Sequence, residues 1–185
     1  MKKKSLVKAK RTVYSYSVLR ETSWYALKAA KENKTGSFFN CMIAMLFSAL
    51  CIEAYFNHLG ETLLTYWDTI EKKLSPEDKL KVITTTLEFQ LDKGSRPFQT
   101  FTEIFKFRNS VAHAKTEYLK QEFEQTIVIK ENPKLPLTEW EEKIDINNAE
   151  RFVEDTKEII TQLHKATKFD KDPFWTSWIA EWEIK

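Results

Sequence analysis

Glycine is scarce in this chain of 185 residues, and its scarcity excludes two kinds of nucleotide-binding site. Only three glycines occur, Gly36, Gly60 and Gly94, and they are far apart in the sequence. The phosphate-binding loop of P-loop proteins and the dinucleotide fingerprint of Rossmann domains both need several glycines within a few residues, because their backbone approaches the phosphates closely. The sequence therefore predicts neither of these sites.

Cysteine and histidine are also few, which argues against disulfides and against a zinc site. Cys41 and Cys51 lie on one predicted helix, about 15 Å apart along its axis, which is too far for a disulfide bond. The three histidines are scattered, and we interpret His58 and His164 as surface or hydrogen-bonded core residues. We expect reduced thiols, a cytoplasmic location and no metal or other cofactor. The 27 acidic residues leave a carboxylate-bound magnesium ion open, although no motif for one occurs.

Neither the charge nor the hydrophobicity of the chain indicates a membrane protein. The 29 basic and 27 acidic residues give a net charge of +2, which neither requires nor excludes a nucleic-acid partner. The apolar run 38–56 is long enough to cross a membrane, but it contains Asn40, Ser48 and Glu53. A carboxylate in the middle of a span costs about 2.5 to 3.5 kcal/mol. We therefore interpret this run as the central helix of a soluble bundle, with no membrane partner.

The two ends of the chain have unusual compositions. The first eleven residues contain six cations and no acid. We expect residues 1–13 to be a flexible, solvated basic arm, with phosphate binding as the alternative. At the other end, Trp175, Trp178 and Trp182 share one side of a short helix predicted over 172–185. Three tryptophans on one face cannot stay exposed on a soluble monomer, so we expect them to dock on the body or on a second chain.

Hydrophobic periodicity and capping signals divide the rest of the chain into helices. The predicted helices span residues 16–33, 38–59, 61–73, 76–91, 97–113 and 146–163. Gly60 should weaken or kink the chain between the second and third of these helices. The helical pattern does not continue through residues 115–145, which should form a small β-hairpin or an ordered loop. No linker or repeat occurs, so residues 1–185 are predicted to be one all-α domain, an up-and-down helical bundle.

The segment Arg108-Asn109-Ser110-Val111-Ala112-His113 carries the strongest functional signal. It places a permanent cation, an amide and a titratable base within little more than one helical turn. An arginine can hold a phosphate, and a histidine can move a proton near neutral pH. In helical projection Arg108 falls inside the apolar arc of its helix, with Asn109 and His113 at the edge. Burying an unpaired charge is costly, so Arg108 must meet a carboxylate, a partner chain or an anionic ligand.

Glu53 is the expected partner of Arg108. It forms a polar stripe with Asn57, four residues further along an otherwise apolar helix. Two interpretations are open: Glu53 orients Arg108 within a functional site, or it only neutralises the arginine in a structural ion pair. The nearby Asn109 and His113 favour a functional site.

The pattern Arg-Asn-x-x-x-His, late in a helical chain, resembles the HEPN superfamily of helical-bundle proteins. The match is closest over residues 105–115, and residues 48–57 are similar to the long central helix of that family. The resemblance covers roughly residues 37–115, and only the six-residue motif is specific. It implies that the predicted bundle is of the HEPN type.

The resemblance also implies a function. In many HEPN proteins the equivalent arginine and histidine cleave RNA without a metal across a two-fold dimer interface, frequently as toxins or defence effectors, and some use an upstream carboxylate. The corresponding site residues here are Glu53, Arg108, Asn109 and His113. The implied partners are RNA, a second copy of the chain, and an antitoxin or sensor protein. RNA supplies its own nucleophile, the 2′-hydroxyl, so the product would be a 2′,3′-cyclic phosphate.

Two other functions fit part of this pattern. A non-catalytic bundle that binds RNA or a nucleotide, or that serves as a sensor, has the same charge arrangement but no need for a titratable group. A purely structural dimeric bundle needs only the ion pair between Arg108 and Glu53. A closed, dry pair far from any concave surface would favour this last function.

Overall fold

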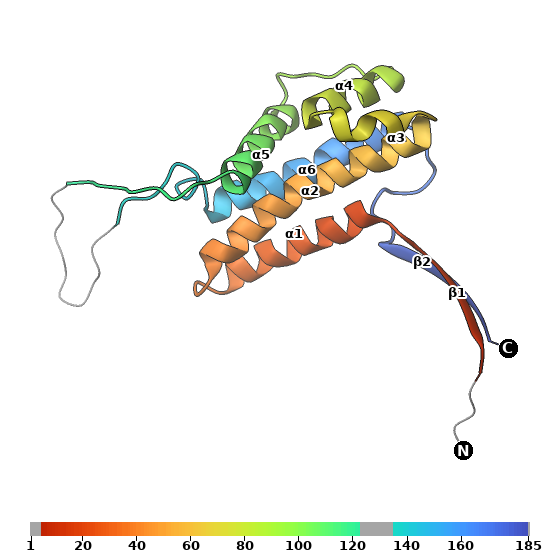
Figure 1. The fold of residues 1–185 in the computed structure, drawn as a ribbon, viewed down its shortest axis with the longest axis horizontal. Coiled ribbons are helices and arrows are strands. Elements are labelled where there is room, and N and C mark those ends of the chain that lie inside the picture. The colour runs from red at the N-terminus through yellow and green to blue at the C-terminus, as the bar shows by residue number, and fades with distance from the viewer. Residues whose placement is uncertain (1–4, 123–134, 185) are drawn as a thin grey trace.

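The computed structural model describes residues 5–122 and 135–184, and this part of the chain is mostly helical (Figure 1). The elements follow one another in the order β1 (Val7–Val13), α1 (Ser15–Glu32), α2 (Ser37–Leu63), α3 (Trp67–Ile70), the short 3₁₀ helix η1 (Glu71–Lys73), α4 (Pro76–Thr86), α5 (Arg96–Ala112), α6 (Ile146–Ala166) and β2 (Trp178–Ile184). The predicted predominance of helix is confirmed, but the chain also contains a small β-sheet.

Helix α2 lies at the centre of the bundle. It contacts α1, α4, α5 and α6, and α6 in turn contacts α1 and α5. Helices α1, α2 and α6 therefore form one group of three that contact one another, and α2, α5 and α6 form a second group. On α2, Met45, Ile52, Phe56 and Leu59 are completely buried. Removing a side chain of this size from water contributes roughly 1.5 to 3 kcal/mol each. The predicted role of this helix as the centre of a bundle is confirmed.

One side of α2 remains apolar and accessible. Among the described residues α2 is the one helix long and apolar enough to cross a membrane, and 39% of its most apolar window is buried in the bundle. Phe39 and Leu50 are 62% and 40% exposed. The core therefore covers only part of the hydrophobic surface of α2.

The two ends of the chain pair with each other, which corrects the predictions for both. Strands β1 and β2 form an antiparallel ribbon in which Val7 lies opposite Ile184 and Val13 lies opposite Trp178. From residue 7 onward the expected flexible arm is a strand, and the expected tryptophan-rich helix over 172–185 is also replaced by a strand. Figure 1 shows the ribbon projecting from the helical body.

Alternation of residue types in β2 explains the ribbon. Side chains of a strand point alternately to its two faces. Glu181 and Glu183 share one face and lie opposite Lys10 and Lys8 of β1, respectively. Opposite charges across a strand pair contribute roughly 0.2 to 1 kcal/mol. The other face of β2 carries Trp178, Ala180, Trp182 and Ile184. Tryptophans four residues apart fit the period of a helix and that of a strand, so the distant partner β1 decides between them.

The tryptophans at this end do not dock on the helical body as the sequence predicted. Trp175, Trp178 and Trp182 are 47%, 51% and 67% exposed. Two of them contact cations: the Arg11 guanidinium lies 5.4 Å from the Trp178 ring centre, and the Lys171 ammonium lies 4.1 Å from that of Trp175. Cation–π contacts of this kind stabilise by about 0.5 to 1 kcal/mol at exposed sites. That a second chain covers the three tryptophans stays a prediction.

Most helix bounds agree with the predictions within a few residues. The predicted helix over 61–73 is interrupted, because α2 ends at Leu63 and α3 begins only at Trp67. Helix α4 ends at Thr86 because Glu88 adopts a left-handed backbone conformation with φ of 52°, which cannot continue a helix. The hairpin expected within 115–145 is not formed by residues 115–122 or 135–145. Its proposed first strand, Thr126–Ile129, lies outside the described residues.

Gly60 does not break α2, which continues to Leu63. A Cβ atom at Gly60 would overlap the ring of Trp67, the first residue of α3. Trp67 is only 1% exposed. The missing side chain at Gly60 therefore allows the indole of Trp67 to cover the end of α2 after the chain turns back.

We predict that Gly60→Ala destabilises the fold. In an unobstructed helix interior this change stabilises by about 1 kcal/mol. Overlap with Trp67 instead forces a shift that costs about 1 to 3 kcal/mol, so the midpoint of urea unfolding should fall. In a Trp67→Ala background the same change should raise the midpoint. A higher midpoint for Gly60→Ala with Trp67 present would show that the ring leaves room for a side chain.

Candidate functional site

Arg108 on α5 and Glu53 on α2 form the ion pair that the sequence predicts. Nη2 of Arg108 donates to Oε2 of Glu53 at 3.0 Å. The guanidinium also lies over the ring of Phe105, 5.6 Å from its centre. The two charged side chains are 26% and 30% exposed. The ion pair is formed, but its two side chains are only partly buried, so water and solutes can reach it.

Two further residues extend this pair into what we call the Glu53 cluster (Glu53, Asn57, Lys79 and Arg108). Nζ of Lys79 on α4 donates to Oδ1 of Asn57 at 2.8 Å and lies 3.7 Å from Oε1 of Glu53. The side chain of Lys79 is only 6% exposed. Sequence analysis found the stripe of Glu53 and Asn57 but missed Lys79. The signal that could have found Lys79 is its position next to Leu80, which is buried, because a cation in such a position needs an acceptor.

Charge and hydrogen bonding in the Glu53 cluster are not balanced. One carboxylate faces two cations, Lys79 and Arg108. Nε of Arg108 is buried, and no acceptor among the described residues reaches it. An unsatisfied buried donor costs about 1 to 3 kcal/mol. An anion cannot reach the buried Nε, but the surplus of positive charge can attract one to the exposed part of the Arg108 side chain.

Asn109 and His113 lie at the exposed end of α5. The helix ends at Ala112, and the backbone N–H of His113 donates to the carbonyl of Asn109 at 3.0 Å. Both side chains are exposed. His113 follows Arg108 by five positions, so at 100° per residue the two side chains point about 140° apart around the helix axis. One chain therefore brings Arg108 to Glu53 and leaves His113 on another side of the same helix end.

The other two histidines occupy structural positions, as predicted. His164 lies between the hydroxyl of Tyr55, 2.9 Å from Nδ1, and the carbonyl of Lys171, 2.6 Å from Nε2. A carbonyl can only accept, so Nε2 carries the proton and, in the neutral ring, Nδ1 accepts from Tyr55. His58 packs against the ring of Tyr16, and burial lowers its pKa. The exposed histidine is thus the one at the end of α5.

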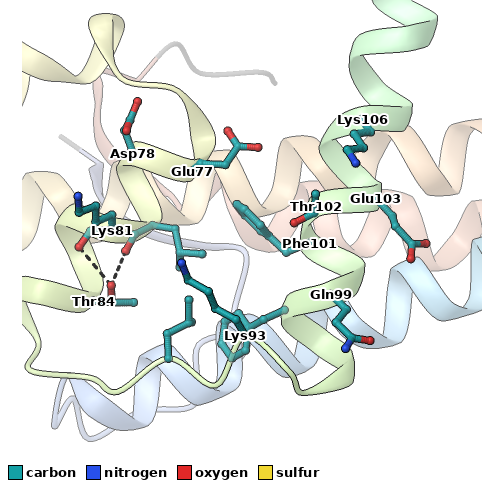
Figure 2. Close-up of a pocket in the computed structure, with 13 residues that line it drawn as sticks. Glu77, Asp78, Lys81, Thr84, Lys93, Gln99, Phe101, Thr102, Glu103 and Lys106 are labelled. Atoms are coloured by element: carbon teal, nitrogen blue, oxygen red, sulfur yellow. Dashed lines mark hydrogen bonds between the residues drawn. The ribbon is translucent and has the colours of Figure 1, made fainter.

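A wide groove between α4 and α5 (Figure 2) lies apart from these residues. Its walls on α5 come from the first part of that helix, up to Lys106, and include none of Glu53, Arg108, Asn109 or His113. The single chain therefore does not place the predicted site in this groove.

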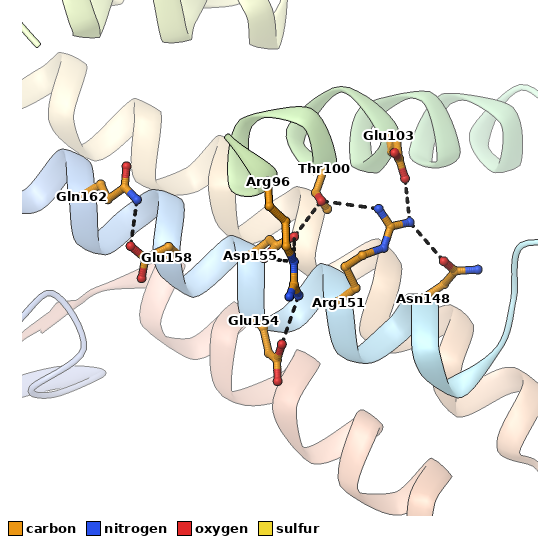
Figure 3. A network of polar contacts seen from close by, with 9 residues as sticks. All are labelled: Arg96, Thr100, Glu103, Asn148, Arg151, Glu154, Asp155, Glu158 and Gln162. Atoms are coloured by element: carbon orange, nitrogen blue, oxygen red, sulfur yellow. Dashed lines mark hydrogen bonds and ion pairs between the residues drawn. The ribbon is translucent and has the colours of Figure 1, made fainter. Parts of the chain in front are cut away.

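A second polar network holds α5 against α6 (Figure 3). Asp155, only 4% exposed, accepts from Oγ1 of Thr100 at 2.6 Å and from Nε of Arg96 at 3.1 Å. Arg151 pairs with Glu103 at 2.6 Å. These contacts fix the first half of α5, and with it the direction of its C-terminal end. Sequence analysis missed them because acids and bases on amphipathic helices usually belong to the solvated face.

The groups that can bind an anion or move a proton at this end of the bundle are few. Among the described residues, no three His, Cys, Asp or Glu side chains gather in an arrangement that suits a metal. Both cysteines are free and buried, and burial raises the pKa of the Cys51 thiol, which keeps it protonated. The available chemistry is that of a guanidinium, an amide and an imidazole on α5.

We predict that Glu53→Gln destabilises the fold more than Arg108→Gln. The first change leaves two cations without a carboxylate, whereas the second leaves Glu53 paired with Lys79. We expect losses in free energy of unfolding of about 2 and about 1 kcal/mol, below the 3 to 5 kcal/mol of a fully buried pair because both side chains are partly exposed. Chemical denaturation of both variants and of the double variant measures these losses and their coupling.

The exposed pair of Arg96 and Glu154 is the matched control for this experiment. Their side chains are 59% and 58% exposed, and the coupling measured by Arg96→Gln and Glu154→Gln should stay below about 0.5 kcal/mol. Equal losses for Glu53→Gln and Arg108→Gln, or additive effects of the two, would contradict the contact geometry described above.

Comparison with known proteins identifies no relative of this chain. No model of a known protein family matches it, and no significant match is found among curated proteins or solved structures.

Proposed function

We propose that the chain is a metal-independent endoribonuclease of the HEPN type that acts as a homodimer. The observation that carries the proposal is the partly exposed side chain of Arg108, which pairs through Nη2 with the one carboxylate that Lys79 also faces. With Lys79 sharing the same carboxylate, a phosphate supplies the missing negative charge. The resemblance of residues 105–115 to the HEPN motif and the helical bundle around α2 support the same assignment.

The proposed reaction uses the 2′-hydroxyl of RNA as the nucleophile. The 2′-oxygen loses its proton to a base and attacks the adjacent phosphorus, and the bond from phosphorus to the 5′-oxygen breaks as an acid protonates that oxygen. The products are a 2′,3′-cyclic phosphate and a 5′-hydroxyl. His113 transfers the protons, Arg108 stabilises the negative charge of the phosphorane, and Asn109 orients His113 or the phosphate. Glu53 holds the guanidinium in position.

A homodimer supplies the groups that one chain lacks. The reaction needs a base and an acid, and each chain offers one exposed histidine on α5, about 140° from its own Arg108. A two-fold axis near the ends of two α5 helices would let His113 of one copy approach Arg108 of the other. Two copies thus provide two cations and two proton carriers in one cleft.

An apolar row on α2 provides a surface for the second copy. We call it the α2 stripe (Phe39, Ile43, Leu46 and Leu50). Its members are three or four residues apart, so they share one face of the helix, and Glu53 continues the same spacing. Phe39 and Leu50 are exposed, while Ile43 and Leu46 are half-buried. Covering the stripe removes apolar surface from water beside the Glu53 cluster, where the proposed cleft forms.

The proposed biological role is that of a toxin or defence effector in the cytoplasm. A nuclease that cuts cellular RNA is harmful to its own cell unless it is controlled. We therefore expect a protein partner, an antitoxin that blocks the cleft or a sensor that releases it.

The second candidate is a non-catalytic module that binds RNA or a nucleotide. The separation of Arg108 and His113 around α5 favours it, because a binding site needs the guanidinium but no proton carrier. For the purely structural bundle the contacts are divided: Arg108 and Glu53 form a closed pair outside the groove between α4 and α5, which favours it, but both side chains are partly exposed, which does not. Replacing His113 by Gln separates the first two functions, since binding persists and only cleavage stops.

We predict that the purified protein cuts single-stranded or looped RNA in the presence of EDTA and leaves a cyclic phosphate. Arg108→Ala and His113→Ala should each lower the rate at least about a hundredfold, the usual effect of losing a charge-stabilising or proton-transferring group. The rate is measured on end-labelled RNA, and a single 2′-deoxy nucleotide at the cut site should abolish cleavage there because the nucleophile is missing.

Two variants serve as controls for this assay. His58→Ala should stay active and tests the position of the histidine. His164→Ala should also retain activity in its folded fraction, although loss of its two core hydrogen bonds will lower the stability. Equal cleavage of the deoxy substrate, or inhibition by EDTA, would overturn the proposed mechanism even for a protein that degrades RNA.

We predict that light scattering at micromolar concentration gives about twice the chain mass of 21.9 kDa. The double variant Leu46→Asp/Leu50→Asp should be monomeric, because it places two charges in the proposed interface. Tyr66→Asp is the matched control: Tyr66 is 56% exposed outside the α2 stripe, and its replacement should leave the dimer intact. If the wild-type chain is monomeric, the composite site cannot form. If that monomer partitions into lipid vesicles, the α2 stripe is a membrane-binding surface.

A further inference from the structure

The groove between α4 and α5 is large enough for a small organic molecule. Its volume is about 760 Å³, within the usual range of ligand sites. Its floor is apolar and comes from both helices: Leu80 on α4 and Phe98 and Phe101 on α5 are 6%, 5% and 3% exposed. The segment between the helices adds Leu91 and Lys93 to the wall. The groove therefore offers an apolar floor that is open to solvent on one side.

Three lysines stand on the rim of this groove. Lys81, Lys93 and Lys106 come from α4, the connecting segment and α5, and all three are exposed. No carboxylate in the described part of the chain lies within ion-pairing distance of any of them. Figure 2 shows the side chain of Lys93 reaching over the floor. A lysine can lay its aliphatic stem along an apolar surface and present its ammonium at the edge.

The acids on the rim are held by other partners or compensated by their own helix. Glu103 pairs with Arg151 outside the groove, at 2.6 Å. Oδ2 of Asp78 accepts from Oγ of Ser75 at 2.7 Å. Glu77 and Asp78 both belong to the first turn of α4, where the helix N-terminus offsets their negative charge. With Glu103 neutralised by Arg151, three lysines face two carboxylates, so the groove carries a small excess of positive charge beside its apolar floor.

We propose that this groove binds a small aromatic anion. Its flat ring system lies on Phe98 and Phe101, and its acidic group accepts a charge-assisted hydrogen bond from Lys93, while Lys106 adds to the positive charge of the rim. A cationic or neutral ligand of the same shape makes the contact with the floor but leaves the ammonium groups unpaired. This site shares no residue with the Glu53 cluster and does not depend on ribonuclease activity.

Two fluorescent probes of nearly equal shape test the proposal. 1-Anilinonaphthalene-8-sulfonate carries one sulfonate, and N-phenyl-1-naphthylamine is its neutral analogue. Titration of the full-length protein should give one sulfonate probe per chain, bound at least fivefold more tightly than the neutral probe. Rising salt should weaken only the sulfonate probe, because screening acts on the charge. Equal affinities of the two probes, or several equivalent sites per chain, would overturn the proposal.

Variants of exposed residues locate the binding. Lys93→Gln should weaken the sulfonate probe about three- to fivefold, and Lys93→Gln/Lys106→Gln about tenfold, with the neutral probe unchanged. Thr102→Trp adds a large ring at an exposed position of the wall and should weaken both probes. Lys157→Gln on the exposed face of α6 is the control and should change neither. Unchanged affinity in the double lysine variant, or the same loss with Lys157→Gln, would place the probe elsewhere and refute the groove.

Discussion

The carboxylate of Glu53 on the most apolar helix of the bundle determines how three helices meet. A charge at this position needs a cation, and it receives two, Arg108 from α5 and Lys79 from α4. Both helices therefore place a cation at the same position along α2. Asn57, one turn further along α2, accepts a hydrogen bond from Lys79 and so holds the second cation in place. The Glu53 cluster therefore joins α2, α4 and α5. It also contains Arg108, whose buried Nε has no acceptor among the described residues.

The position of α5 depends on both of its ends. Its first half is held on α6 by the buried Asp155, which binds Thr100 and Arg96. Near its other end Arg108 is held on α2. Between these contacts the apolar face of α5 packs into the core. Asn109 in the last turn and His113 just after it are exposed, although Val111 between them still packs against the core. The side chains best suited to binding or proton transfer, Asn109 and His113, thus lie at the end of a helix that is held in place along the rest of its length.

Two surfaces remain chemically unbalanced in the single chain. The α2 stripe exposes apolar side chains beside the Glu53 cluster, and the ribbon of β1 and β2 exposes Trp178 and Trp182. An isolated two-stranded ribbon is marginally stable in water, and here its charged face is matched across the strands while its apolar face is open. The proposed dimer uses the first surface. The ribbon lies far from it in the fold (Figure 1) and is not needed for the proposed chemistry.

The sequence by itself determined the helices, the central place of α2 and the pairing of Glu53 with Arg108. These follow from local periodicity and from the high cost of an unpaired charge on an apolar face, and both can be evaluated along a single helix. Only the tertiary structure decided the rest. Lys79 joins the cluster because α4 folds back over α2, and Trp178 becomes part of a strand because β1, about 170 residues away, supplies its partner. Both depend on contacts between distant segments, which no local pattern encodes.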